Sequence, residues 1–451
     1  MGDSIEYGSP TEAVAQEDRV RRQLNAIRSS LSFRLGRLLV NSVIRPWNII
    51  VLPFTLPILL WTYGQERLGH RKSPDAGLQL SMGIKKRNCA VLFPTNGVGM
   101  GHYARMYSLA RSLRRTRPGM EIVFFTTNYV LHPLYGEGMT AYHLPNRQKF
   151  EGMGAHTWNL QCEEMLANVF SVHRPSMFVF DGAYPYRGML NAIKSREDVL
   201  RVWVRRVNRS GKDNAPADSY AHFERIVVPG DLIEPDMEEL AKWPVDEINL
   251  TPPLLSVSRD DLHARGTLRY KLGIPDDATV ALVSLGAGEI NDIDNLRELA
   301  IIGLVSRGVH VVLADSMLKP MTKSFKHELV RVVQSFPIMR SRNCLDFAVV
   351  AGGYNSVHEC ILLRLPSVIV PNYETRRDDQ PGRASKAAEG GGAIIVEQVD
   401  RDMIELALDR ICDGDVRAEM AQRLVQNSVD DGAKYLAESL ISAVERGAER
   451  S

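Results

Sequence analysis

The sequence predicts two doubly wound α/β domains that face each other across a cleft, preceded by an N-terminal helical extension. The main observation is a pair of glycine-rich turns, at residues 96–102 (NGVGMGH) and 351–356 (AGGYNS). Each turn follows a short apolar run of β type and opens a helical pattern. In both halves of the chain, further strand-like runs alternate with helical patterns, which is typical of parallel sheets covered by helices.

The glycine turns also indicate what the cleft binds. A strand that ends in glycines and then enters a helix brings bare backbone N–H groups and the positive end of the helix to one place. One such turn is common, but two, with one in each half, indicate a phosphorylated ligand between the domains. In the first turn, Gly97, Gly99 and Gly101 are therefore expected to contact a phosphate or an acceptor molecule.

Composition narrows the class of protein. A length of 451 residues suits two domains with additional segments. A hydrophobic content of 44% and a charged content of 24% are ordinary for a globular protein, and the net charge of +1 gives no case for nucleic acid as a partner. The five cysteines lack metal-ligand spacing and the first sixteen residues are polar and acidic, unlike a secretory signal, so we expect a reduced cytosolic setting.

The N-terminal extension changes character along its length. Residues 1–18 are polar and are expected to be disordered. Residues 19–43 place apolar side chains at helical spacing with arginines between them, which is the pattern of a basic amphipathic helix. The apolar stretch at residues 49–61 contains Pro53 and Pro57, is flanked by aromatic residues and is shorter than a membrane-spanning helix requires.

Two interpretations of this extension stay open, a membrane contact and a soluble helical hairpin packed on the main body. Basic flanks, interfacial aromatic residues and a broken apolar run coincide, which favours contact with the membrane surface through residues 19–72. We therefore expect a cytoplasmic protein that is peripheral on the inner face of the cell membrane. The expected boundaries are 1–83 for the extension, 84–250 for the first domain, and 251–451 for the second domain with its C-terminal helices.

The first domain begins with a predicted βαβ unit. Residues 88–94 (NCAVLFP) and 121–126 (EIVFFT) are expected to be buried parallel strands with a helix between them. Further strands are expected at residues 177–180, 201–204 and 226–228.

Two residues of this domain are catalytic candidates. His102 closes the first glycine turn, and Asp181 follows a predicted strand at the carboxyl edge of the sheet, where ligands collect in open parallel sheets. His102 suits a general base for an acceptor hydroxyl, since imidazole titrates near neutral pH, or a hydrogen-bond donor to phosphate or sugar; alternatively it caps the first helical turn. Asp181 would orient His102, bind an acceptor hydroxyl itself, or cap the next segment.

The second domain repeats the alternation. Its strands are expected at residues 279–284, 309–314, 345–350 and 366–371. Gly286 and Gly288 lie in a short loop after the first of these strands, and such a loop suits a diphosphate. Asp379 and Gln380 lie on a polar loop after the last one and, taken alone, are surface residues.

Glu359 has two competing interpretations. Ser356 and Glu359 match the S-x-x-E capping box, so both would simply start a helix. A carboxylate one turn into a helix beside the cleft can instead hold both hydroxyls of a ribose, as acidic residues do in nucleotide-binding folds. Local spacing alone favours the cap, and one carboxylate cannot fully serve both roles.

Together these motifs resemble the GT-B glycosyltransferases of the family 28 type, the group that contains the peptidoglycan enzyme MurG and the diacylglycerol glycosyltransferases. Residues 99–105 (GMGHYAR) are similar to the first-turn G-x-G-H-x-x-R pattern, although the turn of MurG is denser in glycine. Residues 351–359 (AGGYNSVHE) are similar to the donor motif of the family, and residues 379–384 (DQPGRA) to its sugar-binding loop. The resemblance covers about residues 86 to 430.

The resemblance implies that the second Rossmann-like domain binds a nucleoside diphosphate sugar, with uracil as the base that the family leads us to expect. Glu359 would then hold the ribose, while Asp379 and Gln380 would hold the transferred sugar. The diphosphate would contact Gly286, Gly288, Gly353, Asn355 and Ser356. The first domain would hold a lipid-linked or glycan acceptor, with His102 or Asp181 near its hydroxyl.

We expect a transferase that needs neither cofactor nor metal, because no Asp-x-Asp pair stands at a strand end to hold a divalent ion. Helix N-termini and backbone amides would stabilise the leaving diphosphate instead. Two alternatives are a nucleotide-sugar hydrolase or epimerase on the same scaffold, and a non-catalytic subunit that binds a nucleotide sugar. The basic, tryptophan-flanked extension argues against the first, because an enzyme of soluble metabolites needs no membrane contact.

Overall fold

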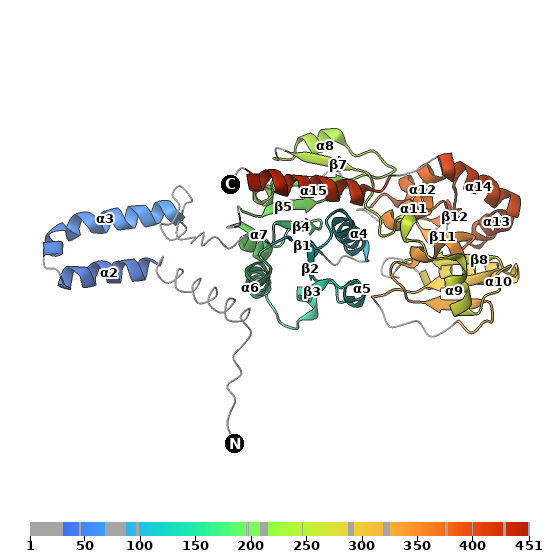
Figure 1. Ribbon diagram of the computed structural model, residues 1–451, viewed down its shortest axis with the longest axis horizontal. Helices are drawn as coiled ribbons and strands as arrows, with labels where there is room; N and C mark the ends of the chain where they lie inside the picture. Colours follow the sequence, from blue (N-terminus) through green and yellow to red (C-terminus); the bar gives the residue numbers. More distant parts are fainter. Residues whose placement is uncertain are drawn as a thin grey trace, which may run out of the picture. The chain divides into compact units, whose positions relative to one another are not determined.

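The computed structural model describes most of the chain (Figure 1). The described residues are 30–44, 47–67, 87–95, 99–194, 196, 198–207, 215–245, 247–286, 293–318, 325–374, 378–398, 400–426 and 430–449. The chain divides into two compact units, Met1–Arg87 with Glu164–Arg174, and Asn88–Glu163 with Pro175–Ser451.

The smaller unit contains a helical hairpin. Helix α2 (Leu31–Ile44) packs against α3 (Trp47–Arg67), as Figure 1 shows. Helix α3 runs through Pro53 and Pro57, each of which removes one backbone N–H donor from the helix. None of the helices that the structure describes is both long enough and apolar enough to cross a membrane.

The larger unit contains two parallel sheets, which confirms the predicted α/β class. The first sheet has seven strands in the order β3-β2-β1-β4-β5-β6-β7. They are β1 (Cys89–Pro94), β2 (Glu121–Thr126), β3 (Thr140–His143), β4 (Met177–Asp181), β5 (Leu200–Val204), β6 (Arg225–Pro229) and β7 (Ile248–Thr251). The helices between these strands in the chain are α4 (Gly101–Thr116), α5 (His132–Gly136), α6 (Ala155–His173), α7 (Arg187–Lys194) and α8 (Met237–Ala241); α6 belongs to the smaller unit from Glu164 onward.

The second sheet has six strands in the order β10-β9-β8-β11-β12-β13. They are β8 (Val280–Ser284), β9 (His310–Ala314), β10 (Val330–Val333), β11 (Phe347–Ala351), β12 (Ser367–Val370) and β13 (Ala393–Ile395). The accompanying helices are α9 (Arg265–Leu272), α10 (Ile293–Ser306), α11 (Tyr354–Leu362), α12 (Gln380–Glu389), α13 (Arg401–Cys412), α14 (Gly414–Gln426) and α15 (Gly432–Glu449). Below, each sheet with its helices is called the first or the second lobe.

The central strands β1, β8 and β11 are mostly apolar and buried because both faces of each sheet are covered. Along β11, Phe347 and Val349 belong to one core cluster, whereas Ala348 and Val350 belong to another on the opposite face. Successive side chains of a strand point to opposite faces, so a strand between two helical layers must be apolar at every position. This is the physical reason that the apolar runs in the sequence identified the strands.

The last helix, α15, packs in the core of the first lobe rather than in that of the second. Leu436 and Leu440 of α15 share one core cluster with residues of α4 and of the first sheet. The chain reaches this place at Gly432, where an added Cβ would lie 2.0 Å from the carbonyl oxygen of Pro252. Only glycine allows this approach, and its N–H donates to the carbonyl of Pro253 at 3.0 Å. The sequence predicted this helix but not where it packs.

Candidate active site

The carboxyl edge of the first sheet brings His102, Arg105 and Asp181 together. Asp181 is the last residue of β4, and His102 and Arg105 lie one turn apart at the start of α4. The Nδ1 atom of His102 lies 2.7 Å from Oδ1 of Asp181. Arg105 donates from Nε to Oδ2 at 2.9 Å and from Nη2 to Oδ1 at 2.8 Å. Asp181 is fully buried and Arg105 is only 3% exposed.

These contacts keep the Asp181 carboxyl ionised. Burial would raise the pKa of the Asp181 carboxyl, but the charges of Arg105 and His102 and their hydrogen bonds hold it below its usual range. An ionised carboxylate only accepts hydrogen bonds, so the 2.7 Å contact with Asp181 is a hydrogen bond in the His102 tautomer that carries its proton on Nδ1. Nη2 of Arg105 lies 2.8 Å from the same nitrogen. In that tautomer the Nε2 atom carries the lone pair. Since 27% of the His102 side chain is exposed, a substrate hydroxyl can approach it.

The structure rules out helix capping as the role of His102. Helix α4 has Met100 as its N-cap, and no side chain caps it. The oxygens of Asp181 pair with His102 and Arg105. Gly101 is the first residue of α4 and Gly99 lies in the bend before it, whereas Gly97 lies outside the described residues.

The second glycine turn, after β11, leads directly into α11. Gly353 is the N-cap, with φ −65° and ψ 150°, and no side chain caps the helix. The capping box of Ser356 and Glu359 is therefore wrong, because the helix begins three residues earlier than that pattern requires. The first N–H groups of a helix lack partners within it and point outward, which makes this turn suitable for an anion. Beside them, the buried Oδ1 atom of Asn355 has no hydrogen-bond partner among the described residues.

Gly352 explains why the start of α12 lies against this turn. An added Cβ would lie 2.9 Å from Cβ of Gln380 and 3.2 Å from Cα of Pro371, so a larger residue would push the elements apart. Gln380 accepts a hydrogen bond from the N–H of Asn372 at 3.0 Å. Asp379 caps α12, accepting from the N–H of Gly382 at 3.1 Å. Asp379 and Gln380 are thus half-buried beside the turn, not simply surface residues.

Gly286 also needs to be glycine, because it follows β8 with φ +93°, in the left-handed region. Gly288 lies outside the described residues.

Glu359 lies in the second turn of α11 and points into the protein. It is 7% exposed, and Oε1 accepts from the hydroxyl of Ser256 and from its N–H at 3.3 Å. Burial raises the pKa of the Glu359 carboxyl to about 7, although the hydrogen bonds from Ser256 oppose the shift. Binding of a ribose by Glu359 stays a prediction, and it requires the hydroxyls of the ribose to share the carboxyl with Ser256 or to replace it.

A network of charges joins the two lobes beside this turn. Arg383 of α12 is fully buried and donates to Asp231 of the first lobe, from Nε at 2.8 Å and from Nη2 at 2.7 Å. Its Nη2 also donates to Asp378 at 2.7 Å. Arg206, which follows β5, donates from Nη2 to Asp378 at 2.7 Å and to Asp231 at 3.1 Å. Burial opposes ionisation of Asp378, but the two arginines lower the pKa of its carboxyl to about 2.

Tyr354 connects this network to the pair of His102 and Asp181. Its ring lies near three guanidinium groups, with Cζ atoms 4.7 Å (Arg206), 5.7 Å (Arg105) and 5.8 Å (Arg383) from the ring centroid. Its hydroxyl donates to the carbonyl of Gly230 at 2.8 Å. Since Tyr354 is the first residue of α11, the second glycine turn and the catalytic candidates of the first lobe lie within one contiguous set of contacts.

Sequence reasoning missed most of this network. Arg206 and Asp231 each come shortly after a predicted strand of the first domain. Charged residues at the carboxyl edge of a parallel sheet could have identified them as candidates for the site. Asp378 lies 172 residues after its partner Arg206, and Arg383 lies 152 residues after its partner Asp231, and no local pattern joins such positions.

We next compared the sequence and the fold of this chain with those of known proteins. No protein-family model matches the chain. A relative from Salinibacter ruber, named UDP-N-acetylglucosamine–N-acetylmuramyl-(pentapeptide) pyrophosphoryl-undecaprenol N-acetylglucosamine transferase, is 24% identical over 396 residues, which cover 79% of this chain and 97% of the relative. Crystal structures show the same fold. MurG of Acinetobacter baumannii has a TM-score of 0.51 and 13% identity, covering 79% of this chain and 100% of its own. Os79 of O. sativa in complex with UDP has a TM-score of 0.53 and 15% identity, covering 80% and 100%.

The chain is similar in sequence to glycosyltransferases of the family 28 type and shares the GT-B fold. The relatives confirm the resemblance that residues 99–105 and 351–359 carried, and they confirm that the protein is a glycosyltransferase. In this chain, the first lobe contributes the buried pair of Asp181 and Arg105 beside His102, and the second lobe contributes the start of α11, which no side chain of the described residues caps.

Proposed function

We propose that the protein transfers a sugar from a nucleoside diphosphate sugar, a UDP-sugar, to a hydroxyl of a lipid-linked or glycan acceptor at the membrane surface. The observation that carries the proposal is the contact of His102 with the buried, ionised Asp181. This contact lies at the sheet edge next to the second glycine turn. A relative of this chain is named for transfer from UDP-N-acetylglucosamine to an undecaprenol-linked acceptor, which supports this choice of donor and acceptor.

In the proposed mechanism, His102 is the general base. Its Nε2 atom takes the proton of the acceptor hydroxyl as the acceptor oxygen bonds to the anomeric carbon of the sugar. The bond from that carbon to the diphosphate oxygen breaks, and the nucleoside diphosphate leaves with the electron pair. Asp181 stabilises the imidazolium that forms, and Arg105 keeps Asp181 ionised.

The leaving diphosphate is stabilised by backbone amides rather than by a metal ion in this proposal. The N–H groups at the start of α11, from Gly353 to Ser356, and the loop at Gly286 provide donors and the positive end of the helix dipole. Oδ1 of Asn355, which has no partner among the described residues, is an acceptor for a sugar hydroxyl or amide. No cofactor is required.

The helical extension is the proposed membrane contact. Its helices expose apolar side chains such as Phe54 and Trp61, at 72% and 70%, and the sequence around them is basic. We place the protein on the cytoplasmic face of the membrane, where a nucleotide sugar and a lipid-linked acceptor meet.

Release of nucleotide by the purified protein tests this function. UDP-, GDP- and dTDP-sugars are offered with and without a lipid extract of the source organism. We expect release of UDP that depends on lipid. Equal release without lipid would support the hydrolase or epimerase, and no release from any donor would support a binding subunit.

A further inference from the structure

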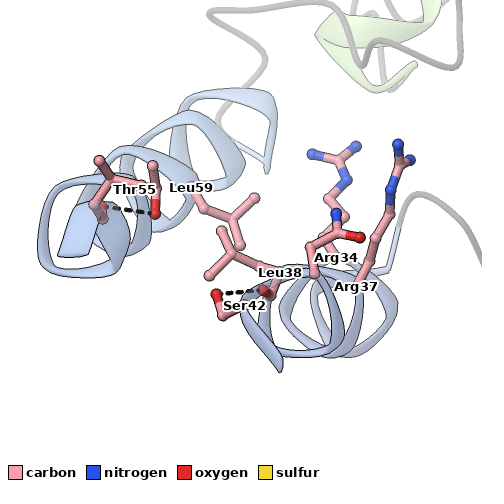
Figure 2. A pocket seen from close by; sticks show the side chains of 8 residues that line it. Arg34, Arg37, Leu38, Ser42, Thr55 and Leu59 are labelled. Carbon is pink, nitrogen blue, oxygen red and sulfur yellow. Dashed lines mark hydrogen bonds between the residues drawn. The ribbon is translucent and has the colours of Figure 1, made fainter. Parts of the chain in front are cut away.

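The hairpin of α2 and α3 contains a pocket of about 390 Å³. Its lining residues come from both helices (Figure 2). They are Arg34, Arg37, Leu38, Asn41, Ser42, Val51, Thr55 and Leu59. The described lining residues all belong to α2 and α3, which pack against each other.

One end of the pocket is cationic. Arg34 and Arg37 lie one turn apart on α2, and Figure 2 shows their side chains extending side by side in the same direction. The guanidinium of Arg34 also lies 6.0 Å from the ring centroid of Tyr63 on α3. Two neighbouring guanidinium groups present planar donor pairs, which match the oxygens of a phosphate.

Apart from Asn41 and the hydroxyls of Ser42 and Thr55, the rest of the pocket wall is apolar. Leu38 and Leu59 point toward each other in the space between the helices (Figure 2). The hydroxyls of Ser42 and Thr55 donate to carbonyls of their own helices, at 2.9 Å to Leu38 and at 3.1 Å to Val51. These hydroxyls therefore offer their protons to the helices and leave methylene and methyl groups along the pocket. A ligand that fits this wall carries an anionic head and a hydrocarbon chain.

The outer surface of the hairpin is suited to a bilayer. Val43, Ile50 and Phe54 are 79%, 72% and 72% exposed. Other large apolar side chains of the two helices are exposed as well, namely Phe33, Leu39, Val40, Ile44, Val51, Ile58, Leu60 and Trp61. Apolar patches of this kind mark protein or membrane contacts.

The charge of the segment favours a membrane contact over a protein contact. Residues 19–72 contain ten arginine or lysine residues and one acidic residue, Glu66, so they carry a net charge of +9. The whole chain is +1, so the remainder carries −8. A segment that is both apolar and strongly basic is attracted to anionic lipid.

We propose that the pocket between α2 and α3 binds the phosphate headgroup of an anionic membrane lipid. Arg34 and Arg37 hold the phosphate oxygens, and the hydrocarbon chain lies along Leu38 and Leu59. The hairpin thus selects the lipid surface on which the enzyme works. This inference rests on the proposed function at the membrane, because it assigns the surface contact to a defined site.

Direct binding to the full-length protein tests the site. The probe is dioctanoyl phosphatidylglycerol below its micelle concentration, titrated by calorimetry. Glycerophosphate represents the head alone, and dioctanoylglycerol the chains alone. We expect the phospholipid to bind at least tenfold more tightly than either part. Glycerophosphate that binds as tightly as the phospholipid would overturn the proposal and indicate a site for free phosphate.

Matched variants separate the pocket from general surface charge. The pocket variant is Arg34→Gln with Arg37→Gln, and the control is Arg67→Gln with Arg71→Gln, which removes two charges of the same basic segment and leaves Arg34 and Arg37 in place. We expect the pocket variant to lose at least tenfold in affinity for the phospholipid and the control less than twofold. Equal losses in both variants would refute a defined site. Circular dichroism of each variant verifies that the helices form.

The same variants distinguish this inference from the proposed function. Nucleotide release is measured with the acceptor dissolved in detergent, where no bilayer is needed. We expect the pocket variant to keep its rate of release. A wild-type protein that releases no nucleotide but binds the phospholipid would refute the transferase and leave the lipid site standing. A pocket variant that binds the phospholipid normally would refute the lipid site alone.

Discussion

Replacement of Asp181 by asparagine tests the catalytic pair most directly. The substitution keeps the shape of the side chain but removes the charge that balances Arg105, which is 3% exposed. Removing one partner of a buried ion pair costs about 3–5 kcal/mol, because the other charge stays buried without compensation. We therefore expect the free energy of unfolding to fall by about this amount, measured by denaturant titration.

The same substitution changes the proton on His102. An asparagine amide that donates to Nδ1 leaves the ring proton on Nε2, where it blocks removal of a proton from the acceptor. In a Ser-His-Asp triad the equivalent exchange lowers kcat by about 10⁴-fold. We expect a loss of about 10³- to 10⁴-fold here, with the KM for the donor sugar unchanged, because Asp181 lies in the first lobe.

His102→Ala provides the matched comparison. It removes the base itself, and we expect a loss in kcat of about 10²- to 10⁴-fold. Its effect on stability should stay below about 1 kcal/mol, since no buried charge is left without its main partner. Groups that act as one unit are not additive, so the double variant should be no slower than the slower single variant.

The assay is the initial rate of nucleotide release at saturating donor and acceptor. Losses that multiply in the double variant would show that Asp181 and His102 act independently. If the Asp181→Asn protein is destabilised but keeps kcat within tenfold, Asp181 has only a structural role as the partner of Arg105, and the catalytic role is refuted.

Three further predictions concern other parts of the molecule. Burial raises the pKa of Glu359 to about 7 from 4.5, so between those pH values the native protein holds a proton that the unfolded chain has lost, and stability falls as pH rises. Denaturant titrations at pH 5 and pH 8 should show this fall in the wild type and a smaller one in Glu359→Gln; an equal fall would contradict the assignment. Tyr354→Phe keeps the ring but removes the hydrogen bonds to Gly230 and Leu254, and should cost about 1–3 kcal/mol in the free energy of unfolding. A variant as stable as the wild type would show that these bonds are dispensable. Deletion of residues 1–72 should release the protein from membranes in sedimentation assays, and unchanged pelleting would refute the membrane contact.

Local patterns in the sequence explain which residues of the site could be identified before the structure was known. His102 was found because it closes the glycine turn after a strand-like run, and Asp181 because it directly follows another such run; the carboxyl ends of parallel strands share one edge. Arg105 was noticed only as part of a motif. Its role became visible when the fold brought its guanidinium within 2.9 Å of Asp181, 76 residues away.

Glu359 shows the opposite case. The sequence offered two roles for it, a helix cap and a ribose ligand. The start of α11 at Tyr354 excluded the cap, and packing against the segment before α9 supplied Ser256 as a partner that no local pattern contains. The partner lies 103 residues away in the chain.

The sequence by itself determined the α/β class, the two glycine turns and the position of the catalytic candidates, because strand burial, helix periodicity and the glycine conformation at a turn are local properties of a chain. Only the tertiary structure decided which charges pair, where α15 packs and how Tyr354 joins the lobes. Those contacts depend on distances between segments that lie far apart in the sequence, and such distances are set by the packing of the whole core rather than by neighbouring residues.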